Sequence, residues 1–276
     1  MFFQDIRQVI PESKIICVSP HYDDFLFFLG GYVLELKAAG LLQTKEFTNV
    51  SVFSRSNYQE RDVEGNKDQS LKRVQYATGI RLIEDLECLD ALLGAHNYSY
   101  LVMGENESQV RGKVLNEGAG EMEMAFGSYE TMDAADREIL ERMSGRIAKL
   151  AQQEDTAIVL PLSMKGHIDH FIAREAGVNA LKRGTNASFY FAEDKPYAGI
   201  MTAEESGIND AFIAEYGLED RGFGFQPEEI LRLAYRYYPS QVDAIYDEGV
   251  LSRSAQLQEA YAKGQGCDRI YAYGKK

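Results

Sequence analysis

Short apolar runs alternate along this chain with longer amphipathic stretches. Strands are predicted where the runs are rich in β-branched and aromatic residues, over Lys14–Ser19, Asn49–Arg55, Thr156–Leu162 and Ser188–Ala192. Helical spacing of apolar residues predicts helices over Phe25–Ala39, Gln69–Thr78, Asp133–Ala151, Asp169–Lys182, Pro227–Tyr238 and Gln241–Asp247. Alternation of strands with helices is typical of an α/β protein, with a mainly parallel sheet and helices on both faces.

No internal repeat, proline-rich linker or low-complexity block divides the 276 residues. The sequence therefore predicts a single domain over residues 1–276. Within it, the stretch Glu105–Thr131 is polar and rich in glycine and glutamate, and we expect it to form an exposed excursion.

The charge balance excludes two classes of partner. With 29 basic and 43 acidic side chains the formal net charge is −14. Sequence-independent binding to nucleic acid needs clustered lysine and arginine, and so does docking on anionic lipid, so neither nucleic acid nor a membrane is expected as a partner.

The compartment is predicted from segments that the sequence lacks. The first residues do not form a signal peptide, and the longest apolar stretch, near Phe25–Leu36, is shorter than a ~20-residue membrane span. The three cysteines, Cys17, Cys88 and Cys267, are odd in number and widely separated, as expected of reduced thiols. We therefore expect a cytoplasmic protein.

Three of the four histidines fall in two short clusters that each follow a predicted buried strand. The first cluster is Ser19-Pro20-His21-Tyr22-Asp23-Asp24, and the second is Gly166-His167-Ile168-Asp169-His170. Ligands and catalytic groups in open α/β sheets gather at the carboxyl ends of strands. A functional site built from both clusters is therefore predicted, whereas the fourth histidine, His96, is expected to be solvent-exposed.

The residue types in these clusters suit a metal site. Two imidazoles and one carboxylate can hold Zn²⁺ and leave a position open for water. Bound zinc lowers the pKa of that water to about 7 and polarises a carbonyl, as amide hydrolysis requires. Because Asp23 and Asp24 are adjacent in one turn, one can bind metal while the other stays free as a base. The same ligands would also hold Fe²⁺ or another divalent ion.

The two clusters resemble the motifs of the PIG-L/LmbE-like family of zinc-dependent N-acetylglucosaminyl deacetylases. Further segments in the same order resemble one branch of that family: Leu160-Pro161-Leu162, Glu193-Asp194-Lys195-Pro196-Tyr197-Ala198 and Tyr238-Pro239-Ser240-Gln241. The resemblance implies a Rossmann-like α/β sandwich. It also implies hydrolysis of an acetamido group on a sugar or glycoside, which releases acetate and a free amine.

The resemblance also implies a role for each residue of the clusters. His21, Asp24 and His170 would be the metal ligands, and Asp23 would be the general base. His167 would either stabilise the oxyanion or protonate the leaving amine. Commoner family members have Pro and Glu where this chain has Tyr22 and Phe25.

Residues around the two clusters complete the predicted site. Asp169 is expected to cap the following helix or to orient His167. Three residues that follow the strand Ser188–Ala192 are expected to line a substrate pocket: Glu193, Asp194 and Tyr197. An arginine- and glutamate-bearing helix, usual in the family after the second strand, matches Lys72 and Arg73 poorly, because Gln75 stands where an acid is expected.

The function predicted from the sequence is thus a zinc-dependent N-deacetylase acting on a small N-acetylated sugar. Two alternatives stay open at this point. One is an amidase of the same chemistry acting on a non-sugar amide or a thiol conjugate, and the other is a non-catalytic module that binds carbohydrate or metal. Asp23 argues against the module, because pure binding does not need a free carboxylate.

Overall fold

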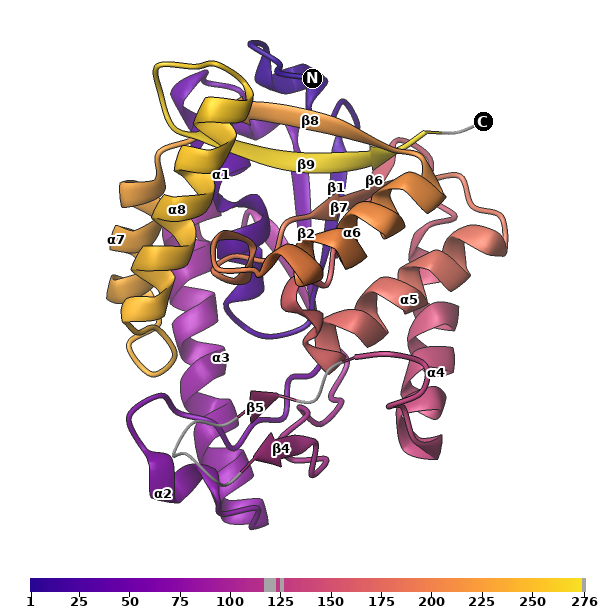
Figure 1. Ribbon diagram of the computed structural model, residues 1–276, viewed down its shortest axis with the longest axis vertical. Helices are drawn as coiled ribbons and strands as arrows, with labels where there is room; N and C mark the ends of the chain where they lie inside the picture. The colour runs from indigo at the N-terminus through magenta and orange to yellow at the C-terminus, as the bar shows by residue number, and fades with distance from the viewer. Residues whose placement is uncertain (117–122, 125–126, 275–276) are drawn as a thin grey trace.

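The computed structural model describes residues 1–116, 123–124 and 127–274 (Figure 1). In these residues the main sheet has seven strands: β1 (Lys14–Ser19), β2 (Glu46–Ser51), β3 (Tyr98–Val102), β6 (Thr156–Pro161), β7 (Ser188–Ala192), β8 (Leu218–Gly224) and β9 (Cys267–Tyr273). A small antiparallel pair, β4 (Val114–Asn116) and β5 (Glu123–Met124), lies apart from this sheet.

The strand order in the main sheet is β3-β2-β1-β6-β7-β9-β8. The first five strands of this order are parallel, and β9 runs antiparallel to both β7 and β8. From β1 the chain moves outward to β2 and β3, then returns to form β6 on the other side of β1. The direction of winding therefore reverses between β1 and β6, and ligands of open α/β sheets bind at such a switch point.

Helices cover both faces of the sheet. On one face, to the left in Figure 1, the core contains side chains of α1 (Asp24–Ala38), α3 (Leu71–Leu93), α7 (Pro227–Tyr237) and α8 (Ala244–Ala260). On the other face it contains side chains of α4 (Ala134–Leu150), α5 (Ile168–Lys182) and α6 (Ala203–Tyr216). None of the helices in the described part of the chain combines the length and the apolar character needed to cross a membrane.

Short helical turns complete the list of elements. They are α2 (Val63–Asn66) and the 3₁₀ turns η1 (Ile6–Gln8), η2 (Leu42–Thr44), η3 (Met164–Gly166) and η4 (Tyr197–Gly199). Two of them, η3 and η4, follow β6 and β7 and lie beside the histidine clusters. Lys195-Pro196, directly before η4, is a cis peptide bond.

The α/β fold expected from the sequence is confirmed, with a mainly parallel sheet and helices around it. The structure adds the strands β3, β8 and β9 and the helix α6, which the apolar pattern did not predict. Strands β3 and β8 lie at the two edges of the sheet and carry many exposed or charged positions, so they lack a continuous apolar run. The helix expected over Gln69–Thr78 extends to Leu93, and the one expected over Gln241–Asp247 begins at Ala244 and extends to Ala260.

The stretch Glu105–Thr131 differs from the expected exposed excursion where the structure describes it. Glu107, Ser108 and Gln109 are buried. Glu107 binds Ser56 and Arg81, and the backbone N–H of Ser108 donates to Asp169 of the second histidine cluster. The expectation for residues 117–122 and 125–126 lies outside the described part of the chain.

Helix α8 meets the η4 turn at two glycines that have no room for side chains. A Cβ on Gly249 would lie 2.2 Å from the carbonyl oxygen of Pro196, and one on Gly199 would lie 1.9 Å from the carbonyl oxygen of Gly249. We expect Gly249→Ala to lower the free energy of unfolding by about 1–3 kcal/mol, as overpacked sites do. Urea unfolding measures this change.

Gly207→Ala is the matched control, because Gly207 also lies inside a helix and a Cβ there has nothing within 4 Å. Alanine at that position is expected to raise stability by about 0.5–1 kcal/mol. Similar effects at Gly207 and Gly249 would contradict the close packing of α8 against η4.

A buried carboxyl on α3 makes stability depend on pH. Asp85 accepts hydrogen bonds from the hydroxyls of Tyr100 and Tyr238 and from the amide of Asn49, and burial raises its pKa to about 8. Between the unfolded value near 3.8 and about 8 the folded chain keeps a proton that the unfolded chain has lost. Stability from this group is therefore present below pH 4 and is lost as pH rises toward 8, by at most about 1.4 kcal/mol per pH unit.

Asp85→Asn is expected to flatten this dependence, because the amide imitates the protonated carboxyl and does not titrate. Urea unfolding of both proteins from pH 5 to pH 8.5 measures the difference in slope. Parallel slopes would show that Asp85 is already ionised at pH 5.

Candidate metal centre

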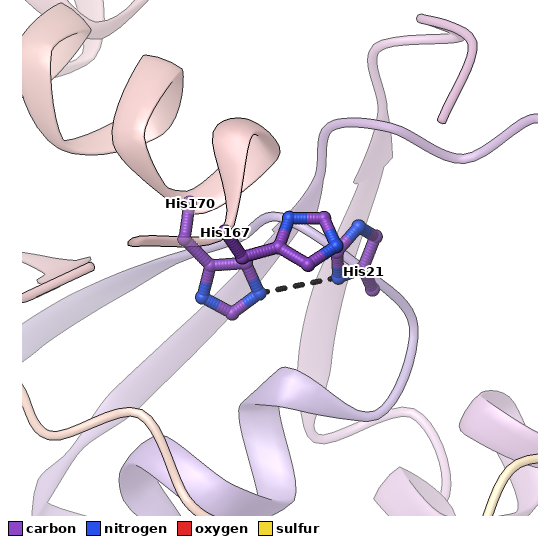
Figure 2. A group of neighbouring side chains, drawn as sticks. All are labelled: His21, His167 and His170. Carbon is purple, nitrogen blue, oxygen red and sulfur yellow. Dashed lines mark hydrogen bonds between the residues drawn. The ribbon is translucent and has the colours of Figure 1, made fainter. Parts of the chain in front are cut away.

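The two histidine clusters come together at the carboxyl ends of the neighbouring strands β1 and β6 (Figures 1 and 2). His21 follows β1, whereas His167 and His170 stand at the beginning of α5, which follows β6. One ring nitrogen from each of the three imidazoles lies within 4.8 Å of the others, a spacing that could hold a metal ion. The side chains of His167 and His170 are buried, and that of His21 is 13% exposed.

Asp24 completes a compact triangle of donor atoms with two of these histidines. His21 Nδ1 lies 3.2 Å from His170 Nε2. Asp24 Oδ2 lies 3.7 Å from the first nitrogen and 3.6 Å from the second. Tetrahedral zinc, with ligand bonds of about 2.0–2.2 Å, holds its ligand atoms roughly 3.3–3.6 Å apart. The donor types and their spacing therefore fit zinc at the centre of these atoms.

Local backbone geometry presents Asp24 to the imidazoles. It is the first residue of α1, and its Oδ2 accepts a hydrogen bond of 2.6 Å from the backbone N–H of His21. A carboxylate in the first turn is also favoured by the helix dipole. The turn between β1 and α1 thus carries two of the three donors.

Each histidine of the triangle is held by a carboxylate on its outer nitrogen. His21 Nε2 lies 3.0 Å from Asp169 Oδ2, and His170 Nδ1 hydrogen-bonds to Asp194 Oδ1. Asp194 also accepts a hydrogen bond of 2.9 Å from the backbone N–H of Met164. Such outer carboxylates fix the tautomer and ring orientation of metal-binding histidines. The inner nitrogens, His21 Nδ1 and His170 Nε2, therefore face each other and share a hydrogen bond of 3.2 Å (Figure 2), which an ion bound between them would replace.

Burial and the surrounding charges shift the pKa values of Asp24 and His170. Burial raises the pKa of the Asp24 carboxyl to about 6, against the opposing effect of His170 and His21. Burial alone would lower the pKa of His170, but Asp24 and Asp194 outweigh it and raise the pKa to about 9. The site therefore concentrates negative charge around its imidazoles, as a cation site does.

His167 is arranged differently from the other two histidines. It is the N-cap of α5, and its Nδ1 accepts a hydrogen bond of 3.1 Å from the backbone N–H of Asp169. An accepting Nδ1 places the ring proton on Nε2. Burial and the neighbouring His21 hold the pKa of His167 well below its usual value. The ring is thus a neutral imidazole with one donor.

The chain reaches His167 through an unusual backbone. Ser163 and Lys165 both have left-handed conformations, with φ of 62° and 57°, and Gly166 follows with φ of 71°. Left-handed conformations cost energy for residues other than glycine and cluster at functional sites. This η3 turn brings the chain sharply from β6 into α5.

Asp23 lies beside the donor triangle without belonging to it. Although it occupies the N-cap position of α1, its side chain makes no capping hydrogen bond. Instead its Oδ2 accepts a hydrogen bond of 3.1 Å from the Tyr246 hydroxyl of α8, and its Oδ1 lies 3.9 Å from Arg81 Nη2. Asp23 and Asp24 thus point to different partners, as expected from their adjacent positions.

Arg81 is a residue of the site that the sequence did not predict. It lies on α3, is 4% exposed, and binds Gln241, Ser56 and Glu107 as well as approaching Asp23. Glu84, one turn further along α3, binds Ser240 and Gln241.

Arg81 and Glu84 thus place an arginine and a glutamate of α3 beside Asp23 and the segment Ser240–Gln241. The residues considered from the sequence lie more than two helical turns earlier: Lys72 is exposed, and Arg73 binds Asp62 and Asn57. The helix predicted from the sequence ended at Thr78, and only its extension to Leu93 places Arg81 and Glu84 on it.

Asp169 and Glu193 make contacts that the sequence did not predict. His167, not Asp169, is the N-cap of α5; the Asp169 carboxylate binds His21, while its backbone N–H donates a hydrogen bond to His167 Nδ1. Glu193 is buried in ion pairs with Arg253 and Arg269. Tyr197 lies near the imidazoles, with its ring centroid 6.2 Å from that of His170. His96 is exposed, as expected.

Comparison with known proteins identifies the fold. No family model and no curated protein matches the sequence. Among solved structures, the zinc-inhibited form of a teicoplanin deacetylase has a TM-score of 0.64 at 18% identity and covers 95% of this chain and 100% of its own. The deacetylase of the A40926 pseudoaglycone has a TM-score of 0.55 at 15% identity and covers 96% and 100%.

A third solved structure with this fold is an N,N'-diacetylchitobiose deacetylase from Pyrococcus horikoshii, crystallised with an inhibitor. It has a TM-score of 0.50 at 13% identity and covers 97% of this chain and 86% of its own. The chain therefore has the fold of these deacetylases, and the Rossmann-like architecture implied by the family resemblance is confirmed.

Proposed function

We propose that this chain is a metal-dependent N-deacetylase that hydrolyses the acetamido group of a small N-acetylated sugar or glycoside. The observation that carries the proposal is the triangle of His21 Nδ1, Asp24 Oδ2 and His170 Nε2, with edges of 3.2–3.7 Å, at the switch point of the sheet. The shared fold with three proteins named as deacetylases supports the same activity.

In this proposal His21, Asp24 and His170 hold one zinc ion. Bound zinc would supply Lewis acidity, which polarises the substrate carbonyl and makes water a nucleophile near neutral pH. Fe²⁺ also fits this mixed nitrogen and oxygen donor set, so the metal in the cell is settled by its availability as well as by the site.

Asp23 acts as the general base. Its carboxylate lies next to Asp24 in the chain but makes no contact with the imidazoles, so it is free to accept a proton from the attacking water. Tyr246 and Arg81 hold it in place from two other helices, which keeps the acceptor oxygen in one orientation.

His167 stabilises the oxygen of the substrate carbonyl as negative charge develops on it. The observation that favours this role over protonation of the amine is the neutral ring, with Nδ1 occupied and the proton on Nε2. A donor fixed in a buried site stabilises an oxyanion without reorganisation. The proton taken up by Asp23 then remains available for the departing amine.

The proposal includes a single catalytic domain and a cytoplasmic location, both as predicted from the sequence. The residues that would contact the sugar are Tyr197, at the edge of the site, and Arg81, whose Nη2 faces Asp23. Glu193 and Asp194 hold other side chains by ion pairs and hydrogen bonds, so we propose a supporting role for them rather than substrate contact.

The experiment begins with elemental analysis of protein purified without chelator or added metal. About one zinc or iron per chain supports the site, and acetate release is then measured with N-acetylated sugars, thiol conjugates and simple amides. Acetate release from sugars alone supports the proposal, whereas release from the other amides alone would establish the amidase alternative. No bound metal, and no uptake of Zn²⁺ on titration, would overturn the hydrolase and leave a binding module.

A further inference from the structure

An arginine from the segment between β3 and β4, with a side chain only 8% exposed, reaches the outer side of the candidate metal centre. Arg111 Nη2 lies 2.8 Å from Asp169 Oδ1, and Asp169 Oδ2 in turn lies 3.0 Å from His21 Nε2. We propose that Arg111 is a positioning residue for metal binding, acting through Asp169 on His21. This inference rests on the proposed function, because it takes His21 Nδ1 as a metal-binding atom.

The contact between Asp169 and His21 decides which nitrogen faces the ion. The Asp169 carboxylate is fully buried, and its Oδ2 accepts a hydrogen bond from the N–H at His21 Nε2. The lone pair of Nδ1 then points toward His170 Nε2, 3.2 Å away. A rotation of the Asp169 carboxylate would therefore turn the His21 ring out of the donor triangle.

Arg111 makes this buried carboxylate stable in one orientation. Arg111 Nη2 donates to Asp169 Oδ1, so a guanidinium lies against the side of the carboxylate that His21 does not contact. The backbone N–H of Ser108, from the same segment, donates a second hydrogen bond of 2.9 Å to Asp169 Oδ2. The segment thus supplies both the countercharge and a directional donor.

The guanidinium is itself fixed from three sides. Its Nε lies 3.0 Å from Asp136 Oδ1 at the start of α4, and its Nη1 donates to the carbonyl oxygen of Asn106 at 2.6 Å. It also lies over the ring of Phe53, 4.9 Å from the centroid, and that ring is a neighbour of His21. Arg111 therefore links the first turns of α4 and α5, a bridge that requires the planar fork of arginine.

Lysine at this position would keep one positive charge but lose the bridge. Its single ammonium cannot bind Asp169 and Asp136 with the separate, coplanar donors that Arg111 uses. Methionine would remove the charge as well and leave Asp169 buried without a countercharge. The two substitutions therefore separate the effect of orientation from that of charge.

The test measures zinc affinity directly, by competition of the metal-stripped full-length chain with a chromophoric chelator. Arg111→Met is expected to weaken zinc binding 10- to 100-fold, the range typical of lost outer partners of metal ligands. Arg111→Lys is expected to weaken it less, but by more than twofold. Arg111 and Arg142 line one surface hollow, where Arg142 pairs with Glu105 and is half-exposed, so Arg142→Met is the matched control. This control is expected to bind zinc within twofold of the unaltered chain.

A second readout separates positioning from a general loss of stability. With Co²⁺ in place of zinc, the visible absorption bands report the ligand geometry, and we expect them to change in Arg111→Lys but not in Arg142→Met. Arg111 borders a hollow of about 310 Å³. Added methylguanidinium is therefore expected to restore part of the zinc affinity of Arg111→Ala, which a merely destabilised fold would not show.

Zinc affinity within twofold of the unaltered chain, with the same cobalt spectrum, in Arg111→Lys and Arg111→Met would overturn this inference alone. If Arg111→Met fails to fold, as judged by circular dichroism, the result for Arg111→Lys decides by itself. Absence of zinc binding by the unaltered chain would instead overturn the proposed function together with the inference.

Discussion

Replacing His170 with alanine is expected to remove metal and activity together. His170 supplies one of three donors in the proposed triangle, and Asp194, its buried partner, is left without an imidazole. We expect metal content to fall from about one ion per chain to near zero and acetate release to fall more than about 10³-fold, because the metal supplies both the activated water and the polarised carbonyl. Elemental analysis and an acetate assay on the same preparation measure both.

Two further histidine variants serve as a control and as a test of the alternative ligand assignment. His96→Asn changes an exposed histidine in a left-handed turn, a conformation that asparagine tolerates, and is expected to keep both metal and activity. His167→Ala is expected to keep the metal but to release acetate more slowly. Stoichiometric metal in His170→Ala together with metal loss in His167→Ala would show that the ligand assignment is wrong.

Asp23→Asn is expected to keep the metal and lose at least ~10²-fold in rate. The amide can still accept the hydrogen bond from Tyr246, and Asp23 is not one of the three triangle donors, so the geometry of the site should persist. An amide cannot take a proton from water, and loss of a general base costs typically 10²–10⁴-fold. The turnover number at saturating substrate, measured on protein with a known metal content, reports the effect.

The control for this change is Asp210→Asn, which removes an exposed carboxylate from α6. It is expected to leave the turnover number unchanged. A turnover number for Asp23→Asn within about threefold of the unaltered chain would refute the role of Asp23 as the base. Loss of metal in the same variant would instead place Asp23 among the ligands.

The local features of the site could be predicted from the sequence. His21, Asp23 and Asp24 follow one apolar run directly, and His167 and His170 follow another, so each group was assigned to a strand end without knowledge of the fold. The strands β1, β6 and β7 and the helices α1, α4, α5 and α7 were expected within two residues of their observed ends. These features depend on residues a few positions apart in the sequence, and the spacing of apolar residues is therefore enough to predict them.

Other parts of the site could not be predicted in this way. Asp194 was expected to contact substrate, yet it holds His170. Asp169 was expected to cap its helix or orient His167, yet its carboxylate holds His21, which follows β1. Arg81 and Arg111 were not singled out at all. Each of these contacts joins residues from different elements, and their side chains carry no signal that distinguishes them from other polar positions.

The sequence alone therefore determined the fold class, the two clusters and the chemistry that their residue types suit. Only the tertiary structure decided which carboxylate stands behind which imidazole, and that Arg81 and Arg111 reach the site. The physical reason is that hydrophobic periodicity fixes which face of an element is buried, whereas the order of strands and the packing of helices bring residues 21, 111 and 169 together. Contacts over such separations depend on the whole folded chain.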